Sequence, residues 1–452
     1  MFKIKEKTSY VALAIIALLP FCLIFNDNIW FDESYTLALI QHSYPEIIEI
    51  LKTDMHPPLY FLSLKLFCNT FGYSIISTKV FSILGYSATV FIGGIILKKH
   101  FDLQTSFVYA VAVTAIPMVF YFSVQQRSYS WCIFFVTICF LQAVIAIKEE
   151  KSKYFIFMAI SGLFASYNHF FALLAVGIIF AYINIFVFIK KRTHLKNILL
   201  SDTIIIIGYS LWVIPLLNQA QDAADNFWLK GIEPLSVIVF VFSLVIIGIF
   251  LLIKENRIFE VIFAAICVFC LQTIGLIGTV FIRPFYIARY SVVIVGISAC
   301  LISFAYKSMG EIVKKIVIIL LCLMCAVNLS LTLIFEYDYS INNFRSSFHN
   351  ELSKKDVFLY FDSSFGIMSY YYPHNKHICT YKENWFSAFE NLEFIEKNQI
   401  QNLVSKKQNN IWIVKNSLTK TPDYIKNLFT LKKSYSFKCD FNLYEVYSVV
   451  HK

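Results

Sequence analysis

The chain has 452 residues, of which 58% are hydrophobic and 15% are charged, and its mean hydropathy is +0.65. This composition excludes an ordinary soluble protein, because the apolar runs repeatedly reach the roughly 20 residues that span a bilayer. The net charge of +10 does not indicate a nucleic-acid partner, since Lys and Arg clusters that hold loops in the cytoplasm account for it. The sequence predicts a polytopic α-helical membrane protein.

The first apolar run covers residues 9–25 and follows the lysine-rich residues 3–7. Lysines before a first span keep the N-terminus in the cytoplasm. No small-residue cleavage site follows the run, so we interpret it as an uncleaved span. The next run, residues 57–71, has only about 15 residues and contains Lys65, which suits an interfacial or re-entrant element.

The remaining runs complete a prediction of about 11 spans with the C-terminus outside. The predicted cytoplasmic turns are rich in positive charge, as the positive-inside rule requires. The later spans are predicted at residues 75–97, 103–122, 131–147, 154–168, 170–189, 197–217, 235–253, 258–281, 290–306 and 316–335. The basic residues of the cytoplasmic turns are Lys148, Lys151, Lys153, Lys190, Lys191, Arg192, Lys196, Lys254, Arg257, Lys307, Lys314 and Lys315.

The predicted outer turns carry a different set of ionisable residues. Such groups at the edge of a bilayer are costly unless they face water, a partner or a substrate, so they predict a site on the outer face. Arginine offers a planar fork of donors suited to phosphate, which favours an anionic ligand such as a lipid phosphate. The alternative is that single arginines only reach toward lipid headgroups. The set consists of Asp32, Glu33, Asp54, His56, Arg127, His169, Arg283 and Arg289.

Asp32 and Glu33 directly follow the aromatic pair Trp30-Phe31 after the first span. A carboxylate close to a bound phosphoester can take a proton from an attacking hydroxyl and make that oxygen more nucleophilic. An acid pair can instead bind a divalent cation, so both chemistries stay open here. The chain shows no phosphate-cradling Gly-rich loop, which favours a lipid-linked donor over a nucleotide sugar.

From about residue 336 polar residues become frequent and the apolar runs shorten, which predicts a separate small α/β domain. We expect it either to position an acceptor or to act as a structural cap. Cys379 and Cys439 lie outside the predicted spans, and a disulfide between them is left open. The predicted segments are strand 356–361, helix 363–372, strand 377–381, helix 385–405, strand 410–414, helix 423–431 and strands within 434–450.

Four stretches resemble the GT-C type membrane glycosyltransferases, specifically the dolichyl- or polyprenyl-phosphate-sugar-dependent group similar to glycosyltransferase family 39. This group includes protein O-mannosyltransferases and lipid A aminoarabinose transferases, and the resemblance extends over residues 1–305. In the third stretch Gln125 stands where the family usually has Glu, which removes a candidate acid. The stretches are Trp30-Phe31-Asp32-Glu33, Asp54-Met55-His56-Pro57-Pro58-Leu59-Tyr60-Phe61, Ser123-Val124-Gln125-Gln126-Arg127-Ser128-Tyr129 and Tyr167-Asn168-His169-Phe170, with Arg289-Tyr290 as a weaker match.

The resemblance implies an inverting glycosyltransferase in which Asp32 is the general base and Glu33 supports it. It implies that Arg127, Arg289 and His56 bind the donor phosphate. No cofactor is implied, and a divalent cation is left open but not expected. The further substrate-binding residues that the resemblance implies are Asp54, Tyr60, Tyr129, His169 and Arg283.

The implied partners are a polyprenyl-phosphate-sugar donor, an acceptor that is a glycan, a lipid or a protein, and the lipid bilayer. Residues 1–335 are expected to form the membrane module, with a first outer loop at 26–74, and residues 336–452 an extracytoplasmic α/β domain. The abundance of Ile, Lys, Asn and Phe favours a bacterial source and hence the cytoplasmic membrane.

Two other function classes fit parts of the sequence. A flippase or transporter of polyprenyl-linked or anionic glycan intermediates would also place arginines and acids near the membrane. Against it, the charges gather at one face, and the sequence shows no clearly broken midplane helix or internal repeat. A non-catalytic assembly protein would leave the acidic pair and the His56-Pro57-Pro58 stretch without a cause.

Overall fold

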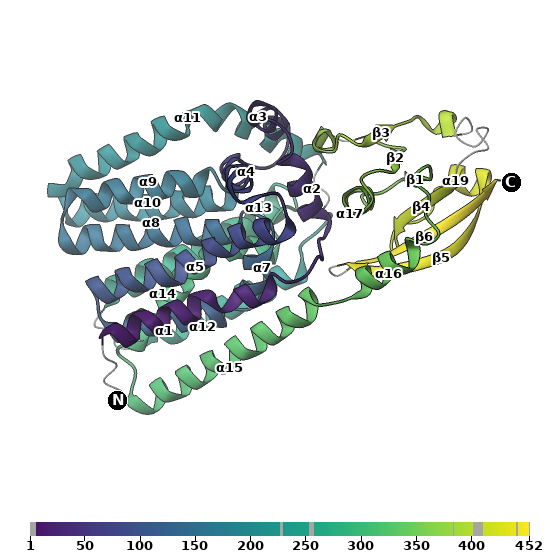
Figure 1. The fold of residues 1–452 in the computed structure, drawn as a ribbon. Coiled ribbons are helices and arrows are strands. Elements are labelled where there is room, and N and C mark those ends of the chain that lie inside the picture. The colour runs from purple at the N-terminus through teal and green to yellow at the C-terminus, as the bar shows by residue number, and fades with distance from the viewer. Residues whose placement is uncertain are drawn as a thin grey trace. The chain divides into compact units, whose positions relative to one another are not determined.

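The structure is a computed structural model that describes residues 6–226, 229–252, 257–382, 384–400, 410–439 and 442–451. It forms two compact units (Figure 1). The membrane unit contains Met1–Ile24 and Met55–Thr332, and the sheet unit contains Phe25–Asp54 and Leu333–Lys452. The predicted division of the chain at residue 336 stays a prediction. In the structure, residues 25–54 cluster with the C-terminal residues.

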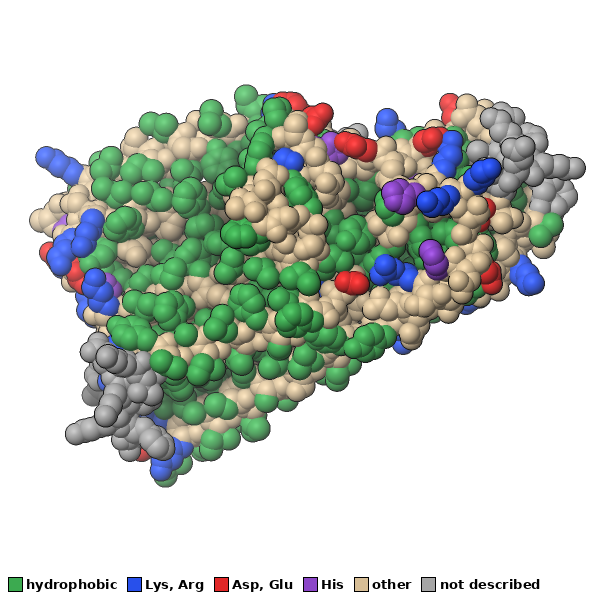
Figure 2. Space-filling model, in the orientation of Figure 1, with side chains coloured by type: hydrophobic (Ala, Val, Ile, Leu, Met, Phe, Trp, Pro, Cys, Tyr) green, Lys and Arg blue, Asp and Glu red, His purple; other side chains and the backbone are tan. Residues whose placement is uncertain are grey.

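The membrane unit is built from helices, and α8 is the most buried of its long helices while α15 is the least. Apolar side chains cover its visible face, and Lys and Arg gather at the end where α1 begins (Figure 2). Lys3, Lys5 and Lys254 lie outside the described residues. The helices are α1 (Glu6–Leu18), η1 (Leu19–Leu23), α4 (Leu59–Phe71), α5 (Ile75–His100), α6 (Leu103–Ala115), α7 (Val119–Val124), α8 (Tyr129–Glu149), α9 (Ser152–Ser166), α10 (Phe170–Lys190), η2 (Arg192–His194), α11 (Leu195–Asn226), α12 (Pro234–Leu252), α13 (Ile258–Phe281), η3 (Ala288–Ile294), α14 (Val295–Tyr306) and α15 (Glu311–Glu336).

These helices confirm the predicted class, a multi-pass membrane protein. Among the described residues, 7 helical segments are long and apolar enough to cross a membrane. Five shorter apolar helices, which include α1, α4, α6, α9 and α12, fall below that length. The predicted count of about 11 spans is therefore not confirmed.

The predicted span at residues 103–122 is broken into two helices, α6 and α7. Pro117 lies in the break, and Met118 adopts a left-handed backbone with φ of 64°. In a continuous helix the Met118 N–H would bond to the Thr114 carbonyl. Here the Asn328 side chain of α15 contacts both groups, because its Oδ1 accepts from Met118 N (3.0 Å) and its Nδ2 donates to Thr114 O (3.0 Å).

The same Asn328 Nδ2 also donates to Ile116 O at 3.0 Å. Pro117 cannot continue the helical ladder, because it lacks an N–H and its ring clashes with the preceding turn. Inside a membrane the backbone groups freed by such a break need other partners, and one amide side chain supplies them here. The prediction of one continuous span at residues 103–122 was therefore wrong.

The sheet unit confirms the predicted small α/β domain. Its sheet has 6 strands in the order β3-β2-β1-β4-β6-β5. The first four strands run parallel, and β6 is antiparallel to both β4 and β5. The elements of the unit are α2 (Phe31–Leu39), α3 (Tyr44–Thr53), α16 (Ser340–Phe348), β1 (Val357–Tyr360), α17 (Phe365–Tyr371), β2 (Lys376–Cys379), η4 (Asn384–Ala388), β3 (Leu392–Phe394), η5 (Lys397–Gln399), β4 (Ile411–Asn416), α19 (Asp423–Leu428), β5 (Phe429–Cys439) and β6 (Asn442–His451).

The core of this unit lies on apolar residues of the parallel strands, including Leu359, Ile378 and Ile413, which are fully buried. Two predicted helices need correction. The predicted helix 385–405 instead contains η4, β3 and η5, and residues 401–409 lie outside the described part. The predicted helix 423–431 ends at Leu428, because the β-branched and aromatic residues that follow join β5.

Cys379 and Cys439 are both free and buried. Cys379 lies on β2 and Cys439 on β5, and the strands β1, β4 and β6 separate them in the sheet. With about 4.8 Å between neighbouring strands, their Cα atoms lie well beyond the roughly 7 Å that a disulfide can bridge. The open question of a disulfide is therefore answered against one.

Candidate functional site

A cluster of polar and aromatic residues forms in the membrane unit where four distant segments meet. The Arg127 Nη2 lies 2.6 Å from His56 Nε2, which joins the turn after α7 to the segment before α4. The Leu59 N–H donates to the Tyr167 carbonyl (3.0 Å), which joins α4 to the turn between α9 and α10. The ring of Tyr290 in η3 completes the cluster. We call the segments around His56, Arg127, Tyr167 and Tyr290 the cationic cluster.

Arg127 is held in a tight and buried turn. Arg127 is only 6% exposed, and its backbone N–H donates to the Gln125 carbonyl (2.7 Å). Guanidinium groups carry five N–H donors and no acceptor, so His56 Nε2 accepts the hydrogen bond from Arg127. A guanidinium fixed in this way presents a planar fork of donors, which suits a phosphate.

His56 precedes the two prolines that open α4. Pro58 is the N-cap of α4, and the helix begins at Leu59. Prolines suit this position, because their missing N–H groups would be unsatisfied in a first turn. The His56 ring meets the edge of Phe61 at 5.9 Å between centroids, which orients the imidazole toward Arg127.

His169 is the N-cap of α10, and its Nδ1 accepts from the Phe171 N–H (3.1 Å). Burial, together with the neighbouring His56, Arg127 and Arg289, lowers the pKa of His169 to about 3. The ring is therefore neutral at physiological pH, with its proton on Nε2. Its centroid lies 6.1 Å from the ring of Tyr129 and 5.4 Å from that of Tyr290.

The segment that carries Arg289 and Tyr290 is fixed against α13. The Thr279 Oγ1 accepts from the Tyr286 N–H (3.0 Å), and the Tyr286 ring packs where a Cβ at Gly275 would lie only 2.5 Å away. The Ala288 N–H donates to Glu233 Oε2 (2.6 Å) at the start of η3. Two predicted donor-binding residues, Arg127 and Arg289, thus lie near the same histidine, His169.

The substrate-binding roles of Arg283 and Tyr60 stay predictions, and the structure shows other contacts for both residues. The Arg283 N–H closes the end of α13 on the Gly278 carbonyl (3.0 Å), and we do not count Arg283 in the cationic cluster. Tyr60 is 1% exposed, and its hydroxyl hydrogen bonds with Ser82 Oγ (2.8 Å). Tyr60 therefore holds α4 against α5 as a packing residue.

Lys79 is a candidate functional residue that was not predicted from the sequence. It lies on α5 and is 1% exposed, which is rare for a lysine. Because residues three apart share a helix face, Lys79 lies on the side of α5 where Ser82 meets Tyr60. A lysine inside an apolar run was the signal available in the sequence, since ionisable residues in membrane helices are functional candidates by default.

Gln125 is the second addition from the structure. It is 2% exposed, and in the part of the chain that the structure describes its Oε1 is buried without a hydrogen-bond partner. Buried polar atoms without partners are uncommon in native proteins. The position where the family usually has Glu therefore carries a neutral amide two residues from Arg127.

Asp32 and Glu33 belong to the sheet unit and lie in the first turn of α2. Glu33 is 5% exposed, and its Oε2 accepts from the Trp30 N–H (3.0 Å), which caps the helix. Asp32 is half-buried at the same helix start, where a negative charge is favoured. Asp54 accepts from the Tyr35 hydroxyl (2.8 Å), so this carboxylate ties α3 to α2.

The predicted site residues thus divide between the units. The membrane unit brings together His56, Arg127, Tyr129 and His169, with Arg289 nearby. The sheet unit holds the three acids. Among the described residues, no group of three or more His, Cys, Asp or Glu side chains is arranged to hold a metal ion.

Comparison with solved structures identifies the fold. No family model matches the chain, and no curated protein matches it. ArnT from Cupriavidus metallidurans in the apo state has a TM-score of 0.67 at 10% identity, with 97% of each chain covered. The same protein bound to undecaprenyl phosphate has a TM-score of 0.64 at 10% identity and the same coverage.

An Archaeoglobus fulgidus oligosaccharyltransferase, in complex with Zn and sulfate, matches with a TM-score of 0.43 at 10% identity, covering 90% of this chain and 68% of that chain. The two ArnT structures extend over both units of this chain and include its C-terminal sheet. The chain has the GT-C glycosyltransferase fold.

Proposed function

We propose that this protein is a membrane glycosyltransferase that moves a sugar from a polyprenyl-phosphate-linked donor to an acceptor on the outer face of the cytoplasmic membrane. The observation that carries the proposal is the buried Arg127 hydrogen bonded to His56 within an ArnT-like fold. A structure of ArnT contains undecaprenyl phosphate, and a fixed guanidinium fork is suited to such a phosphate. Lys79 and Arg289 would add positive charge.

In the proposed reaction, Asp32 takes the proton of an acceptor hydroxyl. The acceptor oxygen then attacks the anomeric carbon from the side opposite the phosphate, and a new glycosidic bond forms. The bond between the anomeric carbon and the phosphate oxygen breaks, and its electron pair leaves with the polyprenyl phosphate. The configuration is inverted, and Arg127 stabilises the charge that develops on the phosphate.

The flippase alternative draws on the broken helix α6–α7. In transporters with broken helices, the freed backbone groups contact the substrate. Here the Asn328 side chain binds Met118 N, Thr114 O and Ile116 O. This arrangement gives the break an internal partner and favours the transferase.

The test uses purified protein, labelled polyprenyl-phosphate sugars and membrane extract as the source of acceptor. Asp32→Asn keeps the shape of the side chain but cannot take a proton, so turnover should fall by about 10²-fold or more while donor binding survives. Glu46→Gln is the matched control, because Glu46 caps the start of α3 by accepting from the Ser43 N–H (2.8 Å), glutamine can do the same, and this variant should retain most turnover.

Each reaction is run with and without a chelator. We expect wild-type activity to persist in chelator, because α2 offers two adjacent acids, fewer fixed oxygen ligands than a tight divalent site needs. Full activity of Asp32→Asn would eliminate the base assignment. Complete loss of wild-type activity in chelator would instead assign the acids to a metal.

A further inference from the structure

The segment that leads into α2, the helix that carries Asp32, is bound to α17 and β5 of the C-terminal domain. The Tyr371 hydroxyl of α17 donates to the Asp27 carbonyl (2.6 Å) and accepts from the Ile29 N–H (3.2 Å). The Cys439 thiol at the end of β5 donates to the Ile29 carbonyl (2.9 Å). Residues 27–29 therefore lie between α17 and β5, and the chain enters α2 from a fixed position.

Helix α2 begins directly on the first turn of α17. The rings of Phe31 and Phe365 meet edge to face, with 6.1 Å between centroids and 89° between planes. At Gly366, an added Cβ would lie 2.6 Å from Ser34 Oγ and 2.9 Å from the Phe31 ring. Real Cβ atoms do not approach other atoms so closely, so α2 can dock here only because residue 366 has no side chain.

The far end of α2 is held by the segment between β2 and β3. The Tyr35 ring packs 6.2 Å from that of Phe389. The His42 Nε2, just after α2, hydrogen bonds to the Ala388 carbonyl (3.0 Å), and its Nδ1 lies 3.4 Å from Glu390 Oε1. The helix is thus attached at both ends and along its length.

The docking position is the point where an α/β sheet usually binds a ligand. The strands β2 and β3 lie on one side of β1 and β4 on the other, so the strand order reverses at the β1–β4 pair. Ligands of open α/β sheets bind beyond the carboxyl ends of the strands at such a switch point. In this chain, the residues after β1 lead directly into Phe365 and Gly366, which contact α2.

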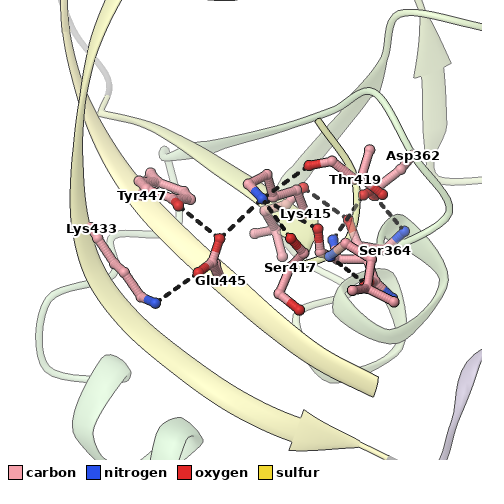
Figure 3. A network of polar contacts seen from close by, with 11 residues as sticks. Asp362, Ser364, Lys415, Ser417, Thr419, Lys433, Glu445 and Tyr447 are labelled. Carbon is pink, nitrogen blue, oxygen red and sulfur yellow. Dashed lines mark hydrogen bonds and ion pairs between the residues drawn. The ribbon is translucent and has the colours of Figure 1, made fainter. Parts of the chain in front are cut away.

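The chain's own hydrogen bonds close this switch point (Figure 3). Asp362 Oδ1 accepts from the Ser364 N–H (3.0 Å), and its Oδ2 accepts from the Asn416 N–H at the end of β4 (2.8 Å). The Ser364 hydroxyl donates to the Val414 carbonyl (2.8 Å). These bonds lock the start of α17 to β4, so Phe365 and Gly366 form a rigid support.

We propose that the C-terminal sheet holds helix α2 in position. Phe365 and Gly366 are positioning residues that fix α2 and thereby Asp32. The switch point of the sheet holds α2 in place of a small ligand. The proposal rests on the function proposed for Asp32. It predicts that the support affects turnover and leaves donor binding alone, because Arg127 and His56 belong to the membrane unit.

The test measures turnover, donor affinity and hydrogen–deuterium exchange of full-length Gly366→Ala and Gly366→Val. We expect kcat to fall by roughly 10- to 100-fold, more for valine, since a displacement of about 1 Å in a catalytic group costs on this scale. Donor affinity and donor KM should stay at the wild-type values. Exchange should accelerate in residues 31–39 and stay slow in β1 and β4.

The matched control is Gly177→Ala on α10, where an added Cβ meets no atom within 4 Å, and all three readouts should equal wild type. Unchanged exchange of α2 in Gly366→Val would show that the sheet does not hold the helix. Accelerated exchange with unchanged kcat would show that the contact of α2 with Phe365 and Gly366 has no part in turnover. Full activity of Asp32→Asn would overturn the base assignment alone, because the exchange result does not depend on it.

Discussion

The candidate site residues of opposite charge lie in different units and on different kinds of structure. In the membrane unit, Arg127 and Lys79 are buried, and Arg127 hydrogen bonds to the His56 imidazole. In the sheet unit, Asp32 lies at a helix start attached to strands. Asp54 and His56 are two residues apart in the chain, yet they belong to different units. Under the proposed function, donor binding and proton transfer fall to different compact units, so single variants should affect them separately.

The largest effect on the membrane side is expected from Arg127→Ala. It removes both the fork and the charge, so donor binding should weaken by about 1.5–3 kcal/mol, or roughly 10- to 100-fold in Kd. Arg127→Lys keeps the charge without the fork and should lose less. Titration of labelled polyprenyl-phosphate sugar with each purified variant measures the loss.

Asp32→Asn is the control from the other unit, and its donor Kd should match wild type. An equal donor Kd for wild type and Arg127→Ala would rule out the phosphate role. A weakened Kd in Asp32→Asn would break the separation between the units.

A smaller effect on donor affinity is expected from Asn328→Leu. This change removes the bonds to Met118 N, Thr114 O and Ile116 O at the start of α7, which leads to the Arg127 turn. Hydrogen bonds between membrane helices contribute about 0.6–2 kcal/mol, so donor Kd should rise by roughly 3- to 30-fold. Asn328→Asp keeps the acceptor but loses the donor, and should fall between.

The effect of Asn328 is separated from general instability by combining it with Arg127→Ala. If the break positions Arg127, Asn328→Leu should add nothing to the donor Kd of the Arg127→Ala protein. Thr332→Val is the matched control, because Thr332 is buried on α15 and its hydroxyl bonds within that helix, to the Asn328 carbonyl (2.8 Å). Additive losses in the double variant would make Asn328 merely structural.

The sequence predicted most of the fold and the residue types of the site. The membrane class, the α/β domain and the segments around His56, Arg127 and His169 follow from apolar run length, strand patterning and motif spacing. Residue types also marked Glu33 and Asp54 as acids near a membrane surface. Their partners, Trp30 N–H and the Tyr35 hydroxyl, depend on how α2 and α3 fold, and no spacing rule shows them.

Other features depend on contacts between residues far apart in the chain. Residues 103–122 were predicted as one span, and the bonds to the backbone at the break come from Asn328, more than two hundred residues later. Gly366 reads as an ordinary helical glycine until α2 is seen against it. Lys79 stands alone in an apolar run, and its full burial follows from helix packing. Such tertiary contacts, which a single sequence does not display, are what the structure adds.

The last effect is expected on the stability of the sheet unit and not on donor binding. Lys415 is 6% exposed and donates to Glu445 Oε2 (3.0 Å) and to the Thr419 carbonyl (3.0 Å) (Figure 3). Glu445 also accepts from Lys433 (2.7 Å) and from the Tyr447 hydroxyl (2.7 Å). Glu445→Gln leaves the buried ammonium without its carboxylate, which should lower the free energy of unfolding by about 1–3 kcal/mol.

The pH dependence gives this prediction its sign. Hydrogen bonds from Lys433, then from Tyr447 and Lys415, lower the pKa of Glu445 from 4.5 to about 2. A carboxyl whose pKa is lower in the folded state stabilises the fold above its unfolded pKa, and this stabilisation is lost as pH falls from 4.5 through about 2. The difference in thermal midpoint between wild type and Glu445→Gln should therefore have its largest value at pH 7 and become smaller below pH 4.5.

Lys433→Met is the matched control, because this partner is half exposed and solvent screens its charge. It should lower the thermal midpoint much less than Glu445→Gln does. Donor Kd should stay unchanged in both variants, since neither residue belongs to the membrane unit. A midpoint difference that stays constant down to pH 3 would contradict the charged role of Glu445, and a weakened donor Kd in either variant would show that the two units do not act separately.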